Sequence, residues 1–234
     1  MFALVMAFAA AGTAAEPNPA CEPGSVQSLR SDPLAYAAVV RARARAYREP
    51  GRRPIHVFGR RNVNRHTTVL GVLSAVRGAD CKARWYRVQL PLKPNGSIGY
   101  VRAVDVELVP VRTRLDIDLS ERKVTLYRAG RTVLETPAAI GSPATPTPIG
   151  RFYVNQRLRA LDQNGPFGPG GVGISAYSEV LTDWVQGGPI AIHGTNRPDT
   201  IGRAASTGCL RVRNDLLERI FRLALPGTPV VIHP

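Results

Sequence analysis

Short runs of alternating apolar and polar residues occupy the first half of the chain and predict β-strands. Residues 39–47 alternate in this way, with Arg41, Arg43 and Arg45 on the polar side. A period of two places successive side chains on opposite faces of a strand. Further runs lie at residues 69–76, 85–90 and 98–101, and a turn at 94–97 separates the last two. We expect about five short strands between residues 35 and 110, which suits a small barrel.

A second β-rich unit is predicted from about residue 114 to the end of the sequence. Turns at 120–123 and 129–130 separate its first runs, as is typical of hairpins. The expected strands are residues 115–119, 124–127, 132–134, 151–154, 189–192 and 230–232. The stretch from Asp162 to Gly173 is rich in Gly and Pro, and we expect it to form a loop over a site.

One amphipathic helix is predicted near the C-terminus. Asn214 or Asp215 is the expected N-cap, and Glu218 falls in the first turn. Its apolar face comprises Leu216, Leu217, Ile220, Phe221 and Ala224, and Pro226-Gly227 ends it. The chain is therefore predicted to be mainly β, with one or two short helices.

The N-terminus has the pattern of a secretory signal. Residues 2–11 are all apolar, small residues follow at 12–15, and the polar Glu16-Pro17 comes next. A membrane span would need about 20 apolar residues. We expect a signal peptide at 1–15, a linker at 16–34, and an exported protein with no transmembrane segment in the mature chain. The basic residues that usually open such a signal are missing, which leaves its true start open.

The formal net charge of +14 favours an acidic partner. Nucleic acid and the anionic polymers of a bacterial wall both fit this charge, and an arginine-rich composition without any partner fits it equally well. No basic block alternates with aromatic residues as a surface for single strands would require. Because the export pattern also disfavours it, we expect no nucleic-acid partner.

The chain has three cysteines, an odd number for an exported protein. An oxidising compartment pairs exposed thiols. A disulfide between Cys21 and Cys81 would leave Cys209 free. The alternative is that Cys81 is a small buried residue.

Two stretches carry the candidate chemistry: His193-Gly194-Thr195-Asn196 and Ser206-Thr207-Gly208-Cys209-Leu210-Arg211. A thiol is a good nucleophile only as the thiolate, and an imidazole within hydrogen-bond reach supplies that state. His193 ends a predicted strand, and the loop to Cys209 is long enough to bring the two side chains together. We expect Cys209 to be the nucleophile and His193 its base.

Gly208 and Arg211 have expected roles beside that pair. Gly208 lacks a Cβ, so the backbone can approach a substrate carbonyl, and the amides of Gly208 and Cys209 could stabilise an oxyanion. Arg211 could lower the pKa of the thiol or bind a substrate carboxylate. If residues 208–212 are extended, Cys209 and Arg211 point to the same face.

Two other chemistries are disfavoured by spacing. A zinc site needs three or four ligands, and His56, His66 and His233 are scattered along the sequence. No metal or other cofactor is therefore expected. Ser206 could act as a nucleophile with His193, but it lacks the nucleophile-elbow spacing of hydrolases.

The histidine and cysteine stretches together resemble the signature of the L,D-transpeptidase catalytic domain family (YkuD-like). The resemblance covers about residues 113–234, because Asp116 to Tyr127 is similar to the opening strands and Gly141 to Phe152 is similar to a second motif. Two departures are local. Thr207 stands where many members carry a second histidine, and Pro148-Ile149 lengthens the second motif by one residue.

The preceding unit resembles a bacterial SH3-like domain. The resemblance lies in Trp85-Tyr86-Arg87-Val88, Asn95-Gly96, Gly99-Tyr100-Val101 and Val104-Asp105-Val106. Together the two resemblances imply a small SH3-like β-barrel at 35–110, followed by an L,D-transpeptidase β-sandwich at 113–234. A β-rich spacer without a ligand is the alternative for the first unit.

The family resemblance also implies a mechanism. Cys209 would attack the carbonyl between the L-centre of a diamino acid and the terminal D-Ala of a peptidoglycan stem tetrapeptide. His193 would take the thiol proton, and the backbone carbonyl of Gly194 would orient the imidazole. Substrate-binding or oxyanion roles are expected among Gly208, Ser206, Arg211, Thr207 and Asn196.

The implied partners are a donor tetrapeptide and an amine acceptor, in the cell wall or the periplasmic or extracellular space. An amine acceptor gives a cross-link, whereas water gives an L,D-carboxypeptidase that uses the same Cys209–His193 pair. A non-catalytic cell-wall-binding protein is the hypothesis from another class, and the intact pair argues against it. Carbapenems, which trap this family, are expected to acylate Cys209.

Overall fold

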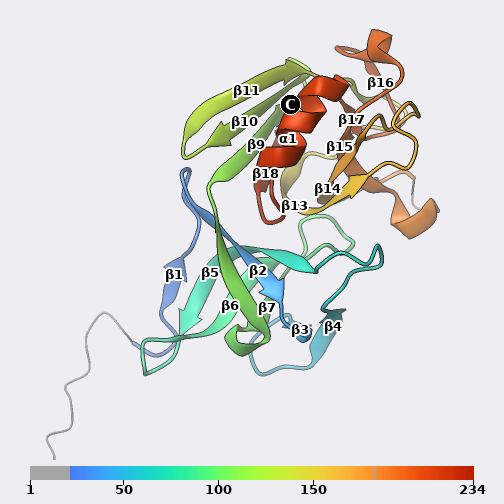
Figure 1. The fold of residues 1–234 in the computed structure, drawn as a ribbon. Helices are drawn as coiled ribbons and strands as arrows, with labels where there is room; N and C mark the ends of the chain where they lie inside the picture. The colour runs from blue at the N-terminus through green and yellow to red at the C-terminus, as the bar shows by residue number, and fades with distance from the viewer. Residues whose placement is uncertain (1–21, 182) are drawn as a thin grey trace, which may run out of the picture.

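The computed structural model describes residues 22–181 and 183–234, which form two β-rich units (Figure 1). The predicted signal peptide at 1–15 lies outside the described residues. Strands dominate both units, and the described chain contains one α-helix. The prediction of a mainly β protein is confirmed.

The N-terminal unit is an eight-stranded sheet in the order β4-β3-β7-β6-β5-β2-β8, with β1 paired to β5. Its strands are β1 Val26–Ser28, β2 Ala35–Val40, β3 Arg43–Tyr47, β4 Pro54–Gly59, β5 Val69–Arg77, β6 Ala83–Gln89, β7 Ile98–Arg102 and β8 Val106–Val111. A short 3-10 helix, η2 (Ala103–Asp105), joins β7 to β8. The predicted turn at 94–97 is present. The SH3-like character of this unit stays a prediction.

The sequence pattern misjudged two segments here. The predicted strand at 39–47 is two strands, because the chain turns at residues 41–42 and changes neighbours: β2 pairs with β5 and β8, whereas β3 pairs with β4 and β7. Alternation continues on both sides of the turn, so periodicity alone could not show it. β1 lies within the predicted linker, where pairing with β5 makes a strand from residues without periodicity.

The C-terminal unit contains a second eight-stranded sheet, in the order β11-β10-β9-β18-β13-β14-β15-β17. Its strands are β9 Thr113–Asp118, β10 Lys123–Arg128, β11 Arg131–Pro137, β13 Gly150–Arg159, β14 Gly170–Tyr177, β15 Pro189–His193, β17 Leu210–Arg211 and β18 Pro229–His233. The short strands β12 (Ile140–Gly141) and β16 (Ala204–Ser206) pair in parallel. The 3-10 helices η3 (Val185–Gly187) and η4 (Pro198–Thr200) lie in loops.

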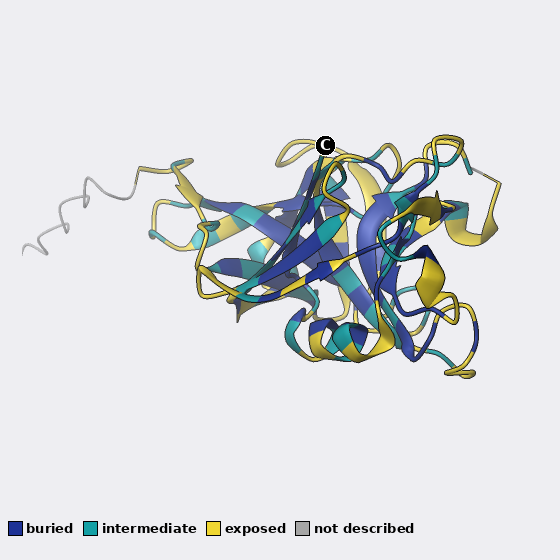
Figure 2. Ribbon diagram, turned by 90° about the horizontal axis from the view of Figure 1, so that it is seen from above, coloured by how far each residue is buried: buried dark blue, intermediate teal, exposed yellow. Residues whose placement is uncertain are grey.

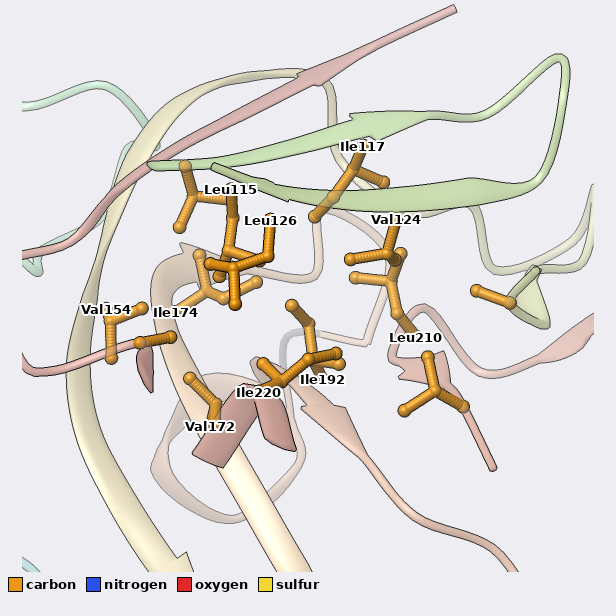
Figure 3. Packing of buried hydrophobic residues seen from close by; sticks show 14 of the residues in the cluster. Leu115, Ile117, Val124, Leu126, Val154, Val172, Ile174, Ile192, Leu210 and Ile220 are labelled. Carbon is orange, nitrogen blue, oxygen red and sulfur yellow. The ribbon is translucent and has the colours of Figure 1, made fainter. Parts of the chain in front are cut away.

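β13 joins the two halves of this sheet. Its residues 150–153 pair with β18, and from Val154 onward it pairs with β14, with a bulge between Val154 and Gln156. The halves therefore face each other, as in a sandwich whose strands change sheet at a bend. Leu115 and Leu126 from one half enclose a single core with Ile174 and Ile192 from the other (Figure 3).

The helix α1 (Asn214–Leu223) closes that core through Leu217 and Ile220, both buried. The predicted cap is wrong. Arg213 occupies the N-cap position and makes no side-chain cap bond. Oδ1 of Asn214 instead accepts a hydrogen bond from the backbone N–H of Thr195 at 2.8 Å.

The predicted loop from Asp162 to Gly173 ends earlier than expected, because β14 begins at Gly170. Gly170, Gly171 and Gly173 give no apolar alternation, and glycine is depleted in strands. Pairing with β13 on one side and β15 on the other defines this strand. The glycine-rich sequence could not reveal it.

Hydrogen bonds and close packing join the two units. The hydroxyl of Tyr153, a fully buried residue of β13, donates to the carbonyl oxygen of Val69 in β5 at 3.1 Å. Nε2 of Gln89 donates to the carbonyl oxygen of Arg151 at 2.6 Å. A Cβ on Gly71 would lie 2.8 Å from the ring of Tyr153, so the glycine admits this ring. Buried residues gather in the strands where the two units meet, whereas most loops and the strands β1 and β4 are mainly exposed (Figure 2).

We predict that Tyr153→Phe destabilises the protein by about 1–2 kcal/mol, because the Val69 carbonyl loses its buried donor. Urea unfolding of the full chain measures the change. Tyr36→Phe is the matched control, since within the described chain the Tyr36 hydroxyl has no hydrogen bond. Equal stability of the two variants would contradict the prediction.

Candidate active site

His193 and Cys209 come from neighbouring parallel strands and share one face of the sheet. In the register of β15 and β17, Ile192 pairs with Leu210 and His193 pairs with Arg211. Ile192 and Leu210 are buried in the core. The alternate residues, including Ala191 and Cys209, therefore face the other way. Cys209 lies diagonally across from His193, at roughly 8 Å between Cα atoms for a two-residue offset on adjacent strands.

Cys209 is a free, half-buried cysteine. Within the described chain its thiol donates to the carbonyl oxygen of Pro189 at 3.8 Å, and it makes no hydrogen bond to His193. Burial raises the pKa of the thiol, and the backbone of Ala191 and the charge of Arg211 lower it by less. Arg211 lowers the pKa of the thiol as predicted, but burial outweighs this effect. Cys209 is therefore a protonated thiol before it reacts. Activation requires a base.

His193 can be that base. It is 4% exposed, and Nδ1 lies 2.5 Å from the carbonyl oxygen of Gly194. A carbonyl only accepts, so Nδ1 carries the proton and Nε2 keeps its lone pair. Burial lowers the pKa of His193 to about 4, opposed by the Gly194 bond and assisted by Arg211. The imidazole is therefore neutral at pH 7 and able to accept a proton.

The ring of Phe167 packs against this imidazole in a T-shaped arrangement, with ring centroids 5.1 Å apart. Phe167 lies in the predicted loop over the site and is itself 58% exposed. Only its place in that loop pointed to this residue.

Gly194 has no room for a side chain. A Cβ there would lie 2.3 Å from Oδ1 of Asn214 and 2.8 Å from Pro169. Asn214 thus packs against Gly194 and holds the next amide, that of Thr195. It positions the carbonyl that orients His193. This role could not be predicted from the sequence, where Asn214 has the pattern of a helix cap.

Ser206 and Gly208 shape the turn that presents Cys209. Oγ of the buried Ser206 donates to the carbonyl oxygen of Cys209 at 2.5 Å and accepts from the N–H of Gly208 at 3.2 Å. The Gly208 amide, predicted to face an oxyanion, is therefore occupied, and the Cys209 amide remains as the candidate donor. Gly208 has φ +109°, a conformation that favours glycine.

The second sequence motif, residues 141–152, forms hydrogen bonds to the same turn. Oγ1 of buried Thr147 donates to the carbonyl oxygen of Gly208 at 2.9 Å, while it accepts from the N–H of Gly141 at 2.9 Å. Oγ1 of Thr145 donates to the carbonyl oxygen of Ser206 at 3.1 Å. This motif therefore fixes the cysteine loop.

Arg211 lies directly opposite His193 in the register, on the same face as Cys209. Its Nε is buried and has no hydrogen-bond partner among the described residues. Buried donors are nearly always paired. The arrangement suits a substrate carboxylate, which takes charge-assisted hydrogen bonds from a guanidinium.

The substrate-binding roles expected of Asn196 and Thr207 stay predictions. Asn196 and Thr207 are exposed, and neither side chain hydrogen-bonds within the described chain.

The other cysteines and histidines do not add to the site. Cys81 is disulfide-bonded, so the alternative of a buried free thiol is wrong. Cys21 lies outside the described residues, and its pairing with Cys81 stays a prediction. Residues 22–181 and 183–234 contain no metal-binding group of three or more His, Cys, Asp or Glu. No helix in those ranges has the length and apolar character to span a membrane.

Residues 112–232 match the family model of the YkuD L,D-transpeptidase catalytic domain. The chain belongs to this family. The match spans the sandwich, the second motif and the histidine and cysteine loops, and it confirms the resemblance seen in the sequence. The SH3-like resemblance lies outside it.

Curated relatives agree with this L,D-transpeptidase assignment. The chain is 38% identical over 122 residues to YkuD of Bacillus licheniformis, which covers 52% of this chain and 66% of the relative. It is 34% identical over 117 residues to YkuD of Bacillus subtilis, covering 50% of this chain and 63% of the relative. The chain thus spans a little under two thirds of the length of these relatives.

Solved structures similar to this chain carry the same family name. An L,D-transpeptidase from Mycobacterium smegmatis has 14% identity and a TM-score of 0.43, covering 64% of this chain and 90% of that one. An Enterococcus faecium L,D-transpeptidase has 26% identity and a TM-score of 0.39, covering 52% of this chain and 49% of that one.

The depressed pKa of His193 predicts a pH-dependent stability. The folded-state value of about 4 lies below the ordinary 6.5, so the unfolded chain binds more protons between these values. The contribution of neutral His193 to the free energy of unfolding is fully present above pH 6.5 and is lost as the pH falls to 4. Urea unfolding at pH 7 and pH 4 should show wild type losing about 3 kcal/mol more than His193→Gln. Equal losses would argue against a buried, neutral imidazole.

Proposed function

We propose that this protein is a peptidoglycan L,D-transpeptidase that forms wall cross-links through a Cys209 acyl-enzyme. The observation that carries the proposal is the pairing of a neutral, buried His193, its Nδ1 held by Gly194, with a free Cys209 on the same sheet face. This combination supplies a nucleophile and a base whose free nitrogen is Nε2. Gly194 takes the orienting part that a carboxylate plays in a triad.

Acylation starts when the thiol turns from the Pro189 carbonyl toward His193. Nε2 takes the proton as Sγ bonds to the carbonyl carbon of the donor tetrapeptide. The Cys209 amide stabilises the oxyanion. The tetrahedral intermediate then collapses: the C–N bond breaks, the imidazolium gives its proton to the leaving amine, and D-Ala departs. A thioester on Cys209 remains.

Deacylation reverses these roles. The side-chain amine of a second stem peptide attacks the thioester, and His193 takes its proton. The C–S bond breaks, and the proton returns to the sulfur. The new amide is the cross-link. Arg211, opposite His193 in the register, binds the carboxylate of the leaving D-Ala, which its unpartnered buried Nε supports.

The substrates place the protein in the cell wall or in the periplasmic or extracellular space. Its partners are the donor tetrapeptide, the amine acceptor and the wall polymer. The N-terminal unit is an SH3-like domain in this proposal. An L,D-carboxypeptidase shares every step up to the thioester, and only the acceptor separates the two activities. Incubation with tetrapeptide muropeptides, followed by separation of cross-linked dimers from tripeptides, decides between them.

We expect Cys209→Ala to abolish both cross-linking and the adduct that a carbapenem forms with the wild type, since both need the sulfur. Intact-protein mass spectrometry measures the adduct. An adduct that persists on the Ala variant would reject Cys209 as the nucleophile. Cys209→Ser is the matched control for folding, because it keeps the size of the side chain.

We expect His193→Ala to lower kcat by about 10²–10⁴-fold while KM changes little, because it removes proton transfer rather than binding. Steady-state kinetics with a tetrapeptide donor gives both constants. His66→Ala, at an exposed position, is the control. Unchanged turnover in His193→Ala would refute the assignment of the base.

A further inference from the structure

A cleft of about 400 Å³ lies between the two units. The N-terminal unit lines it mainly with residues 56–64, from β4 and the loop that follows, and with Pro91 and Leu92. The C-terminal unit contributes Asn155, Gln156, Tyr177, Gln186 and Pro189. The N-terminal unit therefore forms one wall of a cavity whose other wall belongs to the catalytic sheet.

This cleft adjoins the nucleophile. Pro189, which lines it, is the residue whose carbonyl oxygen lies 3.8 Å from Sγ of Cys209. On the face of the sheet that carries Cys209, Ala191 and Gly173 lie between Cys209 and the Asn155 side of the cleft. Gly173 pairs with Ala191, and a Cβ on Gly173 would lie 2.8 Å from Oδ1 of Asn155. The side chains of Asn155 and Gln156 pack over Gly173, so the surface from Cys209 past Ala191 to Asn155 is continuous, and an extended chain can lie along it.

The position of the cleft identifies the part of the donor that reaches it. His193 must contact both the sulfur and the leaving amine, so the leaving residue lies on the His193 and Arg211 side of Cys209. The acyl part of the donor extends the opposite way from the scissile carbonyl. Pro189 and the cleft lie on that opposite side, because Ala191 separates Pro189 from His193 along β15.

The lining has the chemistry to bind a peptide backbone. Oε1 of Gln156 accepts from Nδ2 of Asn62 at 2.9 Å and of Asn64 at 3.0 Å, which fixes the loop of one unit to the other. Asn155 lines the cleft, and its buried Oδ1 has no partner among the described residues, so this acceptor serves a ligand N–H once the side chain turns toward the cleft. Among the described residues, Arg61 lines the cleft and no Asp or Glu does, which suits a ligand that carries carboxylates.

We propose that the cleft binds the amino-terminal part of the donor stem peptide, so that the N-terminal unit completes the donor site. This inference rests on the proposed function. The occupant is the peptide that remains on Cys209 as the acyl group, and the side chains of residues 56–64 bind it ahead of the scissile bond. Short donors, which end before the cleft, gain nothing from the N-terminal unit.

The test uses two tryptophan variants of the full chain on the same strand. Val57 lines the cleft and is 46% exposed, whereas Ile55, two residues earlier on β4, is 47% exposed and does not line it. Val57→Trp fills the cleft without removing a hydrogen bond between the units. Ile55→Trp is the matched control for the added bulk.

Each variant is assayed with a full disaccharide-tetrapeptide donor, with a short donor that retains only the last two residues, and with a carbapenem. Val57→Trp should raise KM for the full donor about tenfold with kcat retained. Its KM for the short donor and its rate of carbapenem acylation should match those of wild type. Ile55→Trp should match wild type throughout.

A second variant tests the unpaired acceptor. Asn155→Leu should raise KM for the full donor by about fivefold and leave carbapenem acylation unchanged. Unchanged KM for the full donor in both Val57→Trp and Asn155→Leu, or equal changes for the full and short donors, would overturn the inference. A wild type that forms neither carbapenem adduct nor product would instead overturn the proposed function and, with it, this inference.

Discussion

The hydrogen bond between Nδ1 of His193 and the carbonyl oxygen of Gly194 is the contact on which the site depends. It fixes the tautomer, which leaves Nε2 free to accept a proton, and burial keeps the ring neutral at physiological pH. The contact itself depends on packing. Gly194 can approach Asn214 and Pro169 only because it has no side chain, and Asn214 holds the adjacent amide of Thr195. The helix that closes the core thus also orients His193.

The catalytic sheet uses its two faces for different purposes. One face buries Ile174, Ile192 and Leu210 against the opposite half of the sandwich and α1. The other face carries His193, Cys209 and Arg211 at one end and the docked N-terminal unit at the other, where Tyr153 bonds to Val69. Because both features share a face, the cleft between the units opens beside Cys209, at Pro189. The proposed donor site follows from this arrangement.

Much of the fold was predictable from the sequence, because short apolar runs bounded by turn residues indicate strands directly. β5, β6, β9, β10 and β15 follow their apolar patterns closely. β14 did not, because its glycines give no pattern and its pairing partners lie far away in sequence. In the site, the Cys209 and His193 stretches were evident from residue type and spacing. Asn214, Thr147 and Phe167 were not, since their contacts with this loop exist only after folding. Ser206 looked like a substrate contact, yet its hydroxyl braces the turn of Cys209.

The most direct test of the account is intact-protein mass spectrometry of the wild type, quenched in acid during turnover of a tetrapeptide donor, with peptide mapping of any adduct. The account predicts a thioester of the donor lacking D-Ala, located on Cys209, and D-Ala release that accompanies its formation. Release of D-Ala with no covalent adduct, or an adduct on a residue other than Cys209, would contradict it.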